Sequence, residues 1–93
     1  MFIKTISLAL FISDALTLKD KRQIIQSIIE KTRRKFNAAI AEVGYQDQWQ
    51  RSRLGIALVS SSASHLESVA QELLHFIQDQ YPVEITEAII NDY

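Results

Sequence analysis

Residues 2–12 read FIKTISLALFI, and residues 53–60 read RLGIALVS. In the first stretch, bulky apolar side chains stand at every second position from Ile6 to Ile12, and the small residues Thr5, Ser7 and Ala9 take the positions of the other face. The second stretch alternates in the same way over residues 54–58. A period of two is the repeat of a β-strand, whose successive side chains point to opposite faces. We therefore expect two central strands, each with one bulky face and one face of small residues.

Two amphipathic helices are predicted between the strands. Residues 18–36 carry apolar side chains at three- and four-residue steps, and so do the residues from the serine cluster 60–64 to about residue 80, two positions before the only proline. Thr17 is expected to cap the first helix. Ser64, or an earlier serine of the cluster, is expected to cap the second.

Shorter apolar stretches over residues 38–43 and 83–90 predict two further strands, so the element order is βαββαβ. Two right-handed βαβ crossovers place both helices on one face of a four-stranded antiparallel sheet in the spatial order 4-1-3-2. The sequence therefore predicts an α+β sandwich of the ferredoxin-like class, with one domain over residues 1–93 and the two most apolar strands at its centre.

The composition excludes several classes of protein. The 93 residues are 47% apolar and 23% charged, with two Gly and no Cys, which is typical of one globular domain and untypical of a disordered chain. The absence of Cys favours a cytoplasmic protein without disulfides. No apolar run reaches the roughly 18 residues of a membrane span, and no signal-peptide cleavage site follows the first strand. We expect no membrane association.

Charge is divided unevenly along the chain. Residues 1–53 hold all ten Lys and Arg and five acids, a net charge of +5, whereas residues 54–93 hold six acids and no Lys or Arg, a net charge of −6. Such asymmetry steers a charged partner toward one part of a surface. The alternative is that two solvated helix faces attract each other after folding.

Sequence signals for catalysis and for cofactor binding are weak. There is no Cys nucleophile and no Gly-rich phosphate loop. His65 and His75 lie ten residues apart on one predicted helix, about 15 Å along its axis, which is too far for one metal ion. Apart from Phe11, the predicted open face has no aromatic side chain on which a base could stack. We expect no enzyme activity, no cofactor and no metal.

Three segments carry a family resemblance. LTLKDKR at residues 16–22 is similar to an SLKEKR helix start, AEVGYQDQWQR at 41–51 is similar to AEV…QDLWQRA, and LGIALVS at 54–60 is similar to LGIAVVS. These segments resemble the YlxP-like family of small bacterial proteins, which has no established function. The chain departs from the family pattern at Thr17, where the family has Ser, and at the serine pair 61–62, where it has Asn-Asp.

The resemblance implies a ferredoxin-like fold and no catalytic activity. It also implies a link to the ribosome, because the family's genes often lie beside those of translation-initiation and ribosome-maturation factors. Our first hypothesis is therefore a non-enzymatic accessory protein that binds the ribosome or structured rRNA. The cations expected to contact phosphate are Lys19, Lys21, Arg22, Arg33, Arg34, Arg51 and Arg53. The alternative for these residues is solvated surface charge.

A second hypothesis is a homodimeric structural or protein-interaction module. The face of the sheet without helices is predicted to carry small and apolar groups where a solvated face would be polar. They are Ile3, Thr5, Ser7, Ala9, Phe11, Gly55, Ala57 and Val59. With strands of about six residues, this face measures about 350 Å², and a dimer built on it alone would bury less than a stable interface needs.

The connection over residues 44–52 is predicted to be a partner-binding loop. It is longer than the two to five residues that a hairpin needs, and it holds the only Trp of the chain. Trp and Arg are enriched in binding hot spots. The expected partner-binding residues are Gln46, Asp47, Trp49, Gln50 and Arg51. The alternative is that Trp49 covers the end of the sheet while Asp47 pairs with Arg51 or Arg53.

Overall fold

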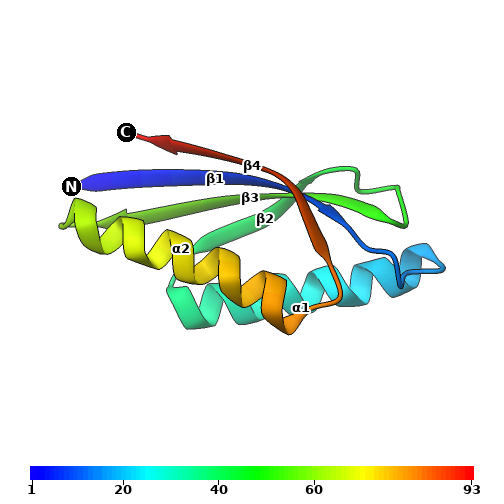
Figure 1. Cartoon of the computed structure of the whole chain (residues 1–93). Helices are drawn as coiled ribbons and strands as arrows, with labels where there is room; N and C mark the ends of the chain where they lie inside the picture. The colour runs from blue at the N-terminus through cyan, green and yellow to red at the C-terminus, as the bar shows by residue number, and fades with distance from the viewer.

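The computed structural model describes residues 1–93, and its elements follow the order βαββαβ (Figure 1). Each predicted element is present, with bounds within two residues of those expected. The strands are β1 (Phe2–Phe11), β2 (Ala39–Gly44), β3 (Arg51–Ser60) and β4 (Glu84–Asp92), and the helices are α1 (Leu18–Phe36) and α2 (Ala63–Gln80).

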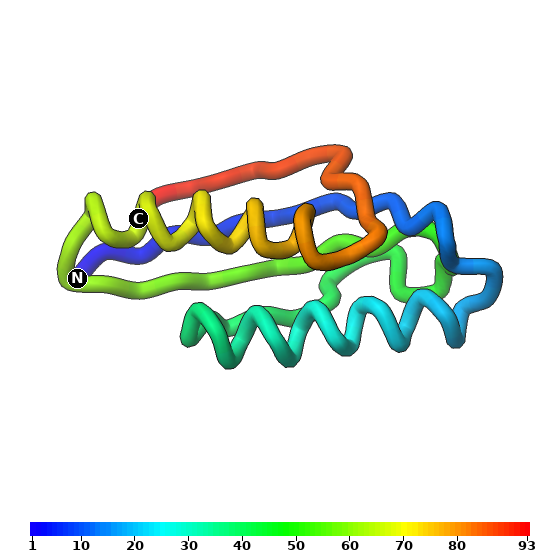
Figure 2. The backbone as a smooth tube through the Cα atoms, turned by 60° about the horizontal axis from the view of Figure 1, so that its bottom comes forward, coloured from blue at the N-terminus to red at the C-terminus, as the bar shows by residue number.

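The four strands form one antiparallel sheet in the order β2-β3-β1-β4. This is the predicted order read from the other edge, and the predicted α+β class is confirmed. β1 and β3 are paired along their whole length, from Phe2 opposite Ser60 to Phe11 opposite Arg51. Both helices lie side by side on one face of the sheet and run in opposite directions, so the other face is left open (Figures 1 and 2).

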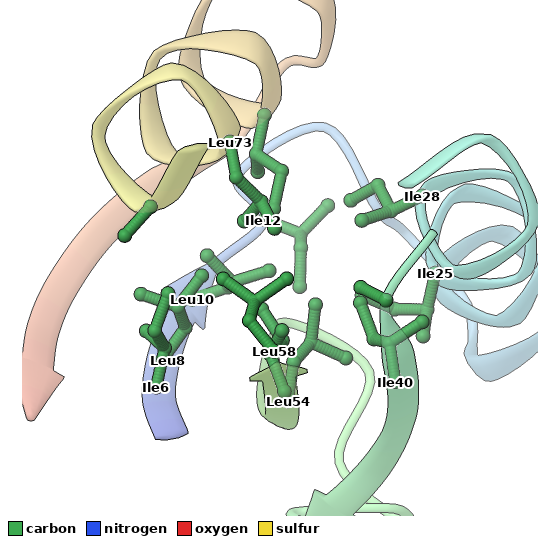
Figure 3. Packing of buried hydrophobic residues seen from close by; sticks show 14 of the residues in the cluster. Ile6, Leu8, Leu10, Ile12, Ile25, Ile28, Ile40, Leu54, Leu58 and Leu73 are labelled. Carbon is green, nitrogen blue, oxygen red and sulfur yellow. The ribbon is translucent and has the colours of Figure 1, made fainter. Parts of the chain in front are cut away.

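The hydrophobic core lies between the sheet and the two helices (Figure 3). The bulky faces of the central strands supply its floor, and Leu8 and Leu54 are fully buried there. Ile28 of α1 and Leu73 of α2 are also fully buried and cover this floor. Burial of one such side chain contributes about 1.5–3 kcal/mol. The core therefore fixes which side of each helix faces the sheet.

Both helices begin at capping residues that the sequence predicted, and the structure shows which serine caps α2. Thr17 Oγ1 accepts a hydrogen bond from the backbone N–H of Asp20 at 3.1 Å, as predicted for the start of α1. At the start of α2 the cap is Ser62, whose Oγ accepts from the N–H of His65 at 3.3 Å. An earlier serine of the cluster therefore caps α2, and Ser64 lies inside the helix.

A buried lysine joins three elements near the chain termini. The Lys4 ammonium group, on the helix-covered face of β1, lies 2.8 Å from Glu67 Oε2 of α2 and 2.6 Å from Asp92 Oδ1 of β4. The hydrogen bonds to Asp92 and then to Glu67 raise the pKa of Lys4. Lys4, followed by Gln71, lowers the pKa of Glu67. Ionisation of these groups is thus coupled to folding.

This network predicts a loss of stability at both extremes of pH. The Glu67 contribution is complete above its ordinary pKa of 4.5 and is lost as the pH falls through the lowered folded value. The Lys4 contribution is complete below 10.5 and is lost as the pH rises through the raised folded value. In melting curves, Lys4→Met should be less stable than the wild type in the neutral range, and the difference should shrink at both extremes. A difference that stays constant across the pH range would contradict this coupling.

Candidate nucleic-acid interface

The outer face of α1 carries a stripe of cations. Lys19, Arg22, Lys31 and Arg34 line a shallow hollow of about 610 Å³ along the helix. The hollow is completed by Gln23, Gln26, Ser27 and Glu30. Lys19 and Arg22 are three positions apart, as are Lys31 and Arg34, so each pair is adjacent on the helix surface. Arg22 and Lys31, nine positions apart, lie on opposite edges of the exposed face. The distance along the axis from the first to the last cation is therefore about 22 Å. We call these four cations the α1 stripe.

The cations of the α1 stripe have no anionic partner within the chain. Among Lys and Arg, only Lys4, Lys21 and Arg53 form ion pairs. Glu30, the acid within the hollow, accepts a hydrogen bond from Gln26 Nε2 at 3.2 Å and pairs with no cation. A surface with uncompensated positive charge attracts polyanions and speeds their association.

The neighbouring helix α2 has the opposite charge and does not neutralise the stripe. It carries Glu67, Glu72 and Asp79 and no Lys or Arg. No ion pair joins α1 to α2. The helices meet through other groups, among them Phe36 and Phe76, whose ring centroids lie 5.6 Å apart. The predicted attraction between two helix faces is therefore not realised as ion pairing, and of the two helices only α1 carries unpaired positive charge.

The prediction that Lys21 contacts phosphate is wrong. Its side chain is fully buried on the inner side of α1, and its ammonium group donates to Glu42 Oε2 at 2.9 Å. It also donates to three backbone carbonyl groups of the β2–β3 connection and the start of β3, those of Tyr45 at 2.9 Å, Gln46 at 3.2 Å and Arg51 at 3.2 Å. Lys21 is therefore a structural cation that holds the beginning of α1 to this connection.

Arg53 also requires a correction, because it lies on the other side of the molecule. It occupies the open face of β3, where its guanidinium donates to Ser7 Oγ at 2.8 Å and to Glu87 Oε1 at 2.8 Å. The sheet separates this face from the helices (Figure 1). Arg53 cannot share a phosphate-binding surface with the α1 stripe.

The remaining predicted cations are exposed but lie in different surroundings. Arg33 Nη2 lies 3.4 Å from the carbonyl oxygen of Ile40, and the Arg51 guanidinium lies over the ring of Tyr45 at 5.0 Å. Neither lines the hollow. The structure thus brings together three of the predicted residues, Lys19, Arg22 and Arg34, and adds Lys31, which was not predicted.

The β2–β3 connection presents a half-exposed tryptophan. Trp49 is 46% exposed, and it lines a second hollow with Phe11, Asp47 and Arg51. The ring therefore covers the end of the sheet only in part. Asp47 forms no ion pair, so the alternative in which it pairs with Arg51 or Arg53 is wrong.

Gln50 has a positioning role in the same connection. Its side-chain amide lies 3.4 Å from the carbonyl oxygens of Ser13 and Ala15. Its own carbonyl accepts from the N–H of Ile12 at 2.8 Å. These hydrogen bonds hold the β2–β3 connection to the segment between β1 and α1, and those of Lys21 hold it to the start of α1. Of the predicted partner-binding residues, Gln46, Asp47, Trp49 and Arg51 are exposed, and Gln50 is partly buried.

Two further observations bear on the site. No group of three or more His, Cys, Asp and Glu side chains is placed so that it could hold a metal ion. None of the helices has the length and apolar character needed to cross a membrane.

The fold and the site define a small α+β sandwich protein with one basic helix exposed beside an acidic one. The chain belongs to the family described as protein of unknown function DUF503, whose family model matches residues 3–90. It is 48% identical over 71 residues to the uncharacterized protein YlxP of Bacillus subtilis (strain 168), and the match covers 76% of each chain. The predicted membership of the YlxP-like family is confirmed.

Two solved structures show the same fold at low sequence identity. The structural-genomics protein YJCS has a TM-score of 0.63 at 12% identity, with 96% of each chain covered. A de novo designed protein with ferredoxin fold has a TM-score of 0.59 at 15% identity, covering all of this chain and 84% of the designed one. At these identities the likeness supports the fold alone.

Proposed function

We propose that the protein is a non-enzymatic accessory factor that binds structured RNA, and ribosomal RNA in particular, through the α1 stripe. The observation that carries this proposal is the row of four exposed, unpaired cations along about 22 Å of one helix. Cations held on a rigid helix suit the phosphates of a nucleic-acid backbone, which supply most of the affinity in such complexes.

The chemistry of the stripe favours recognition of RNA shape over base sequence. The only aromatic residue of α1 is Phe36, and its ring packs edge-on against Phe76. No ring in the hollow is available to stack on a base. Double-stranded RNA is recognised mainly by its shape and through its phosphates and 2′-hydroxyls. The acids of α2 repel phosphate and so orient a bound helix along α1.

Affinity purification from the native cell tests this function. We expect ribosomal RNA to be recovered with the tagged protein and to be lost after nuclease treatment. A variant with Lys19→Gln, Arg22→Gln and Arg34→Gln should recover little RNA while its circular dichroism stays unchanged. Recovery of a nuclease-resistant protein partner and no RNA would overturn the proposal and favour a protein-interaction module.

A further inference from the structure

The open face of the sheet exposes apolar side chains to water. Val59 is 64% exposed, Val43 is 55% exposed and Ile89 is 46% exposed. They come from β3, β2 and β4, so the exposed apolar groups extend across three strands of the sheet. A sheet face that stays in contact with water is normally polar. Contiguous apolar surface of this kind marks an interaction site.

The centre of the open face is flat and made of small residues. Gly55 lies between Ser7 and Ala41, and Ala57 lies between Thr5 and Ala39. These residues line a shallow hollow of about 550 Å³. Val43 lies across Gly55, where an added Cβ atom would come within 3.1 Å of Val43 Cγ1. Small side chains let a second sheet approach to the usual spacing of about 10 Å.

The arginine nearest the centre of this face is neutralised within one chain. Arg53 is held by Glu87 at 2.8 Å and by Ser7, so neither charge is left without a partner. Because Arg53 is already paired with Glu87, it is not free to bind a polyanion. A two-fold symmetric partner would place one neutral pair beside another, which avoids repulsion between like charges.

We infer that the open sheet face is covered by a second copy of this chain in a two-fold symmetric, face-to-face dimer. The area is sufficient because three of the four strands are longer than the six residues assumed in the estimate from the sequence. Strands of 10, 6, 10 and 9 residues, each residue occupying about 3.3 by 4.8 Å, make a face of about 550 Å². Two such faces bury about 1,100 Å², which reaches the roughly 1,000 Å² expected of a biological interface.

The dimer is independent of the proposed RNA interface. The helices cover the face opposite to the dimer surface (Figure 2). Both α1 stripes therefore stay exposed on the outer sides of the assembly. Variants of one surface should leave the other surface functional.

Sedimentation velocity from micromolar to millimolar concentration tests the dimer. We expect the wild type to sediment as a species of twice the 10.6 kDa chain mass. Ala57→Arg places a charge at the centre of the face and should give a monomer. Ser68→Arg, the same addition at an exposed position of α2, should remain a dimer. Circular dichroism checks that each variant is folded.

The outcomes separate the alternatives. If Ala57→Arg does not fold, Val59→Lys at the rim of the face serves in its place, since that side chain is already 64% exposed. A wild type that is monomeric at every concentration overturns the inference. A dimer that survives Ala57→Arg, or Val59→Lys where that variant is used, also overturns it, because another surface would then hold the copies together. RNA binding by a monomer would leave the proposed function intact.

Discussion

Lys21→Met is expected to lower the free energy of unfolding by about 3–5 kcal/mol, the cost of breaking a buried ion pair by removing one partner. The substitution leaves the Glu42 carboxylate without its cation, although only 17% of the Glu42 side chain is exposed to solvent. It also removes a donor from three backbone carbonyl groups of the β2–β3 connection. Urea unfolding of the wild type and the variant measures the difference.

Two control variants separate the buried pair from other effects. The double variant Lys21→Met with Glu42→Gln should recover part of the loss, because the unpaired charge is gone while an acceptor for Ser52 Oγ remains. Lys19→Met, on the exposed side of the same helix turn, should change stability by less than about 0.5 kcal/mol. Equal effects of Lys19→Met and Lys21→Met would show that Lys21 is not the structural cation described here.

Removal of three cations from the α1 stripe is expected to weaken RNA binding by about 100-fold at 0.1 M salt. Each phosphate contact contributes about 0.7–0.9 of a decade in affinity per tenfold change in salt. Lys19→Gln, Arg22→Gln and Arg34→Gln remove three such contacts without touching the core, since none of these residues belongs to the buried cluster. Fluorescence anisotropy with a labelled rRNA hairpin measures the change.

A matched control lies on the same helix. The ammonium group of Lys35 lies over the rings of Phe36 and Phe76, at 5.7 and 5.6 Å, and outside the hollow. Lys35→Gln should lower RNA affinity by less than about threefold, because its ammonium group is directed at the two rings and away from the hollow, so that only a screened attraction through solvent is lost. If Lys35→Gln weakens binding as much as each stripe substitution does, binding depends on net charge and not on the stripe.

The fold could be predicted because its central strands carry an unambiguous period. The alternation from Ile6 to Ile12 defines one bulky face of β1, and the same side chains form the floor of the core. Details that depend on tertiary contacts were harder to predict from the sequence. Several serines could cap α2, and only the path of the chain out of β3 selects Ser62. β3 begins two residues before its predicted start and β4 ends two residues after its predicted end, because polar Arg51 and Asp92 continue the ladders beyond the apolar runs.

The candidate site was predicted in part. Lys21 and Arg22 are adjacent in the sequence, yet one is buried and the other exposed. The helical phase of Ile25 and Ile28 places position 21 on the inner face, so this signal was available. The ring of carbonyl groups that receives the Lys21 ammonium was not predictable, since it forms only when the β2–β3 connection folds back over α1.

Arg53 and Lys31 are two other cations whose side of the molecule the prediction did not take into account. The alternation of bulky residues that begins at Leu54 assigns Arg53 to the open face, opposite the helices, so this signal was available in the sequence. Lys31 lies three positions before Arg34 and shares its helix face, so a helical projection would have included it. The charge count along the chain indicated a basic half, but the side on which each cation lies has to be read from the helical or strand phase of its position.

The most direct test of binding through the α1 stripe is the salt dependence of the affinity for a structured rRNA fragment. With the four cations of the stripe in contact with phosphate, the slope of log K against log salt concentration should be about −2.8 to −3.6. Affinity should then fall about 50- to 150-fold between 50 and 200 mM salt. The variant with three stripe cations removed should give a slope near −1. A wild-type slope near zero, or one unchanged in the variant, would contradict the account.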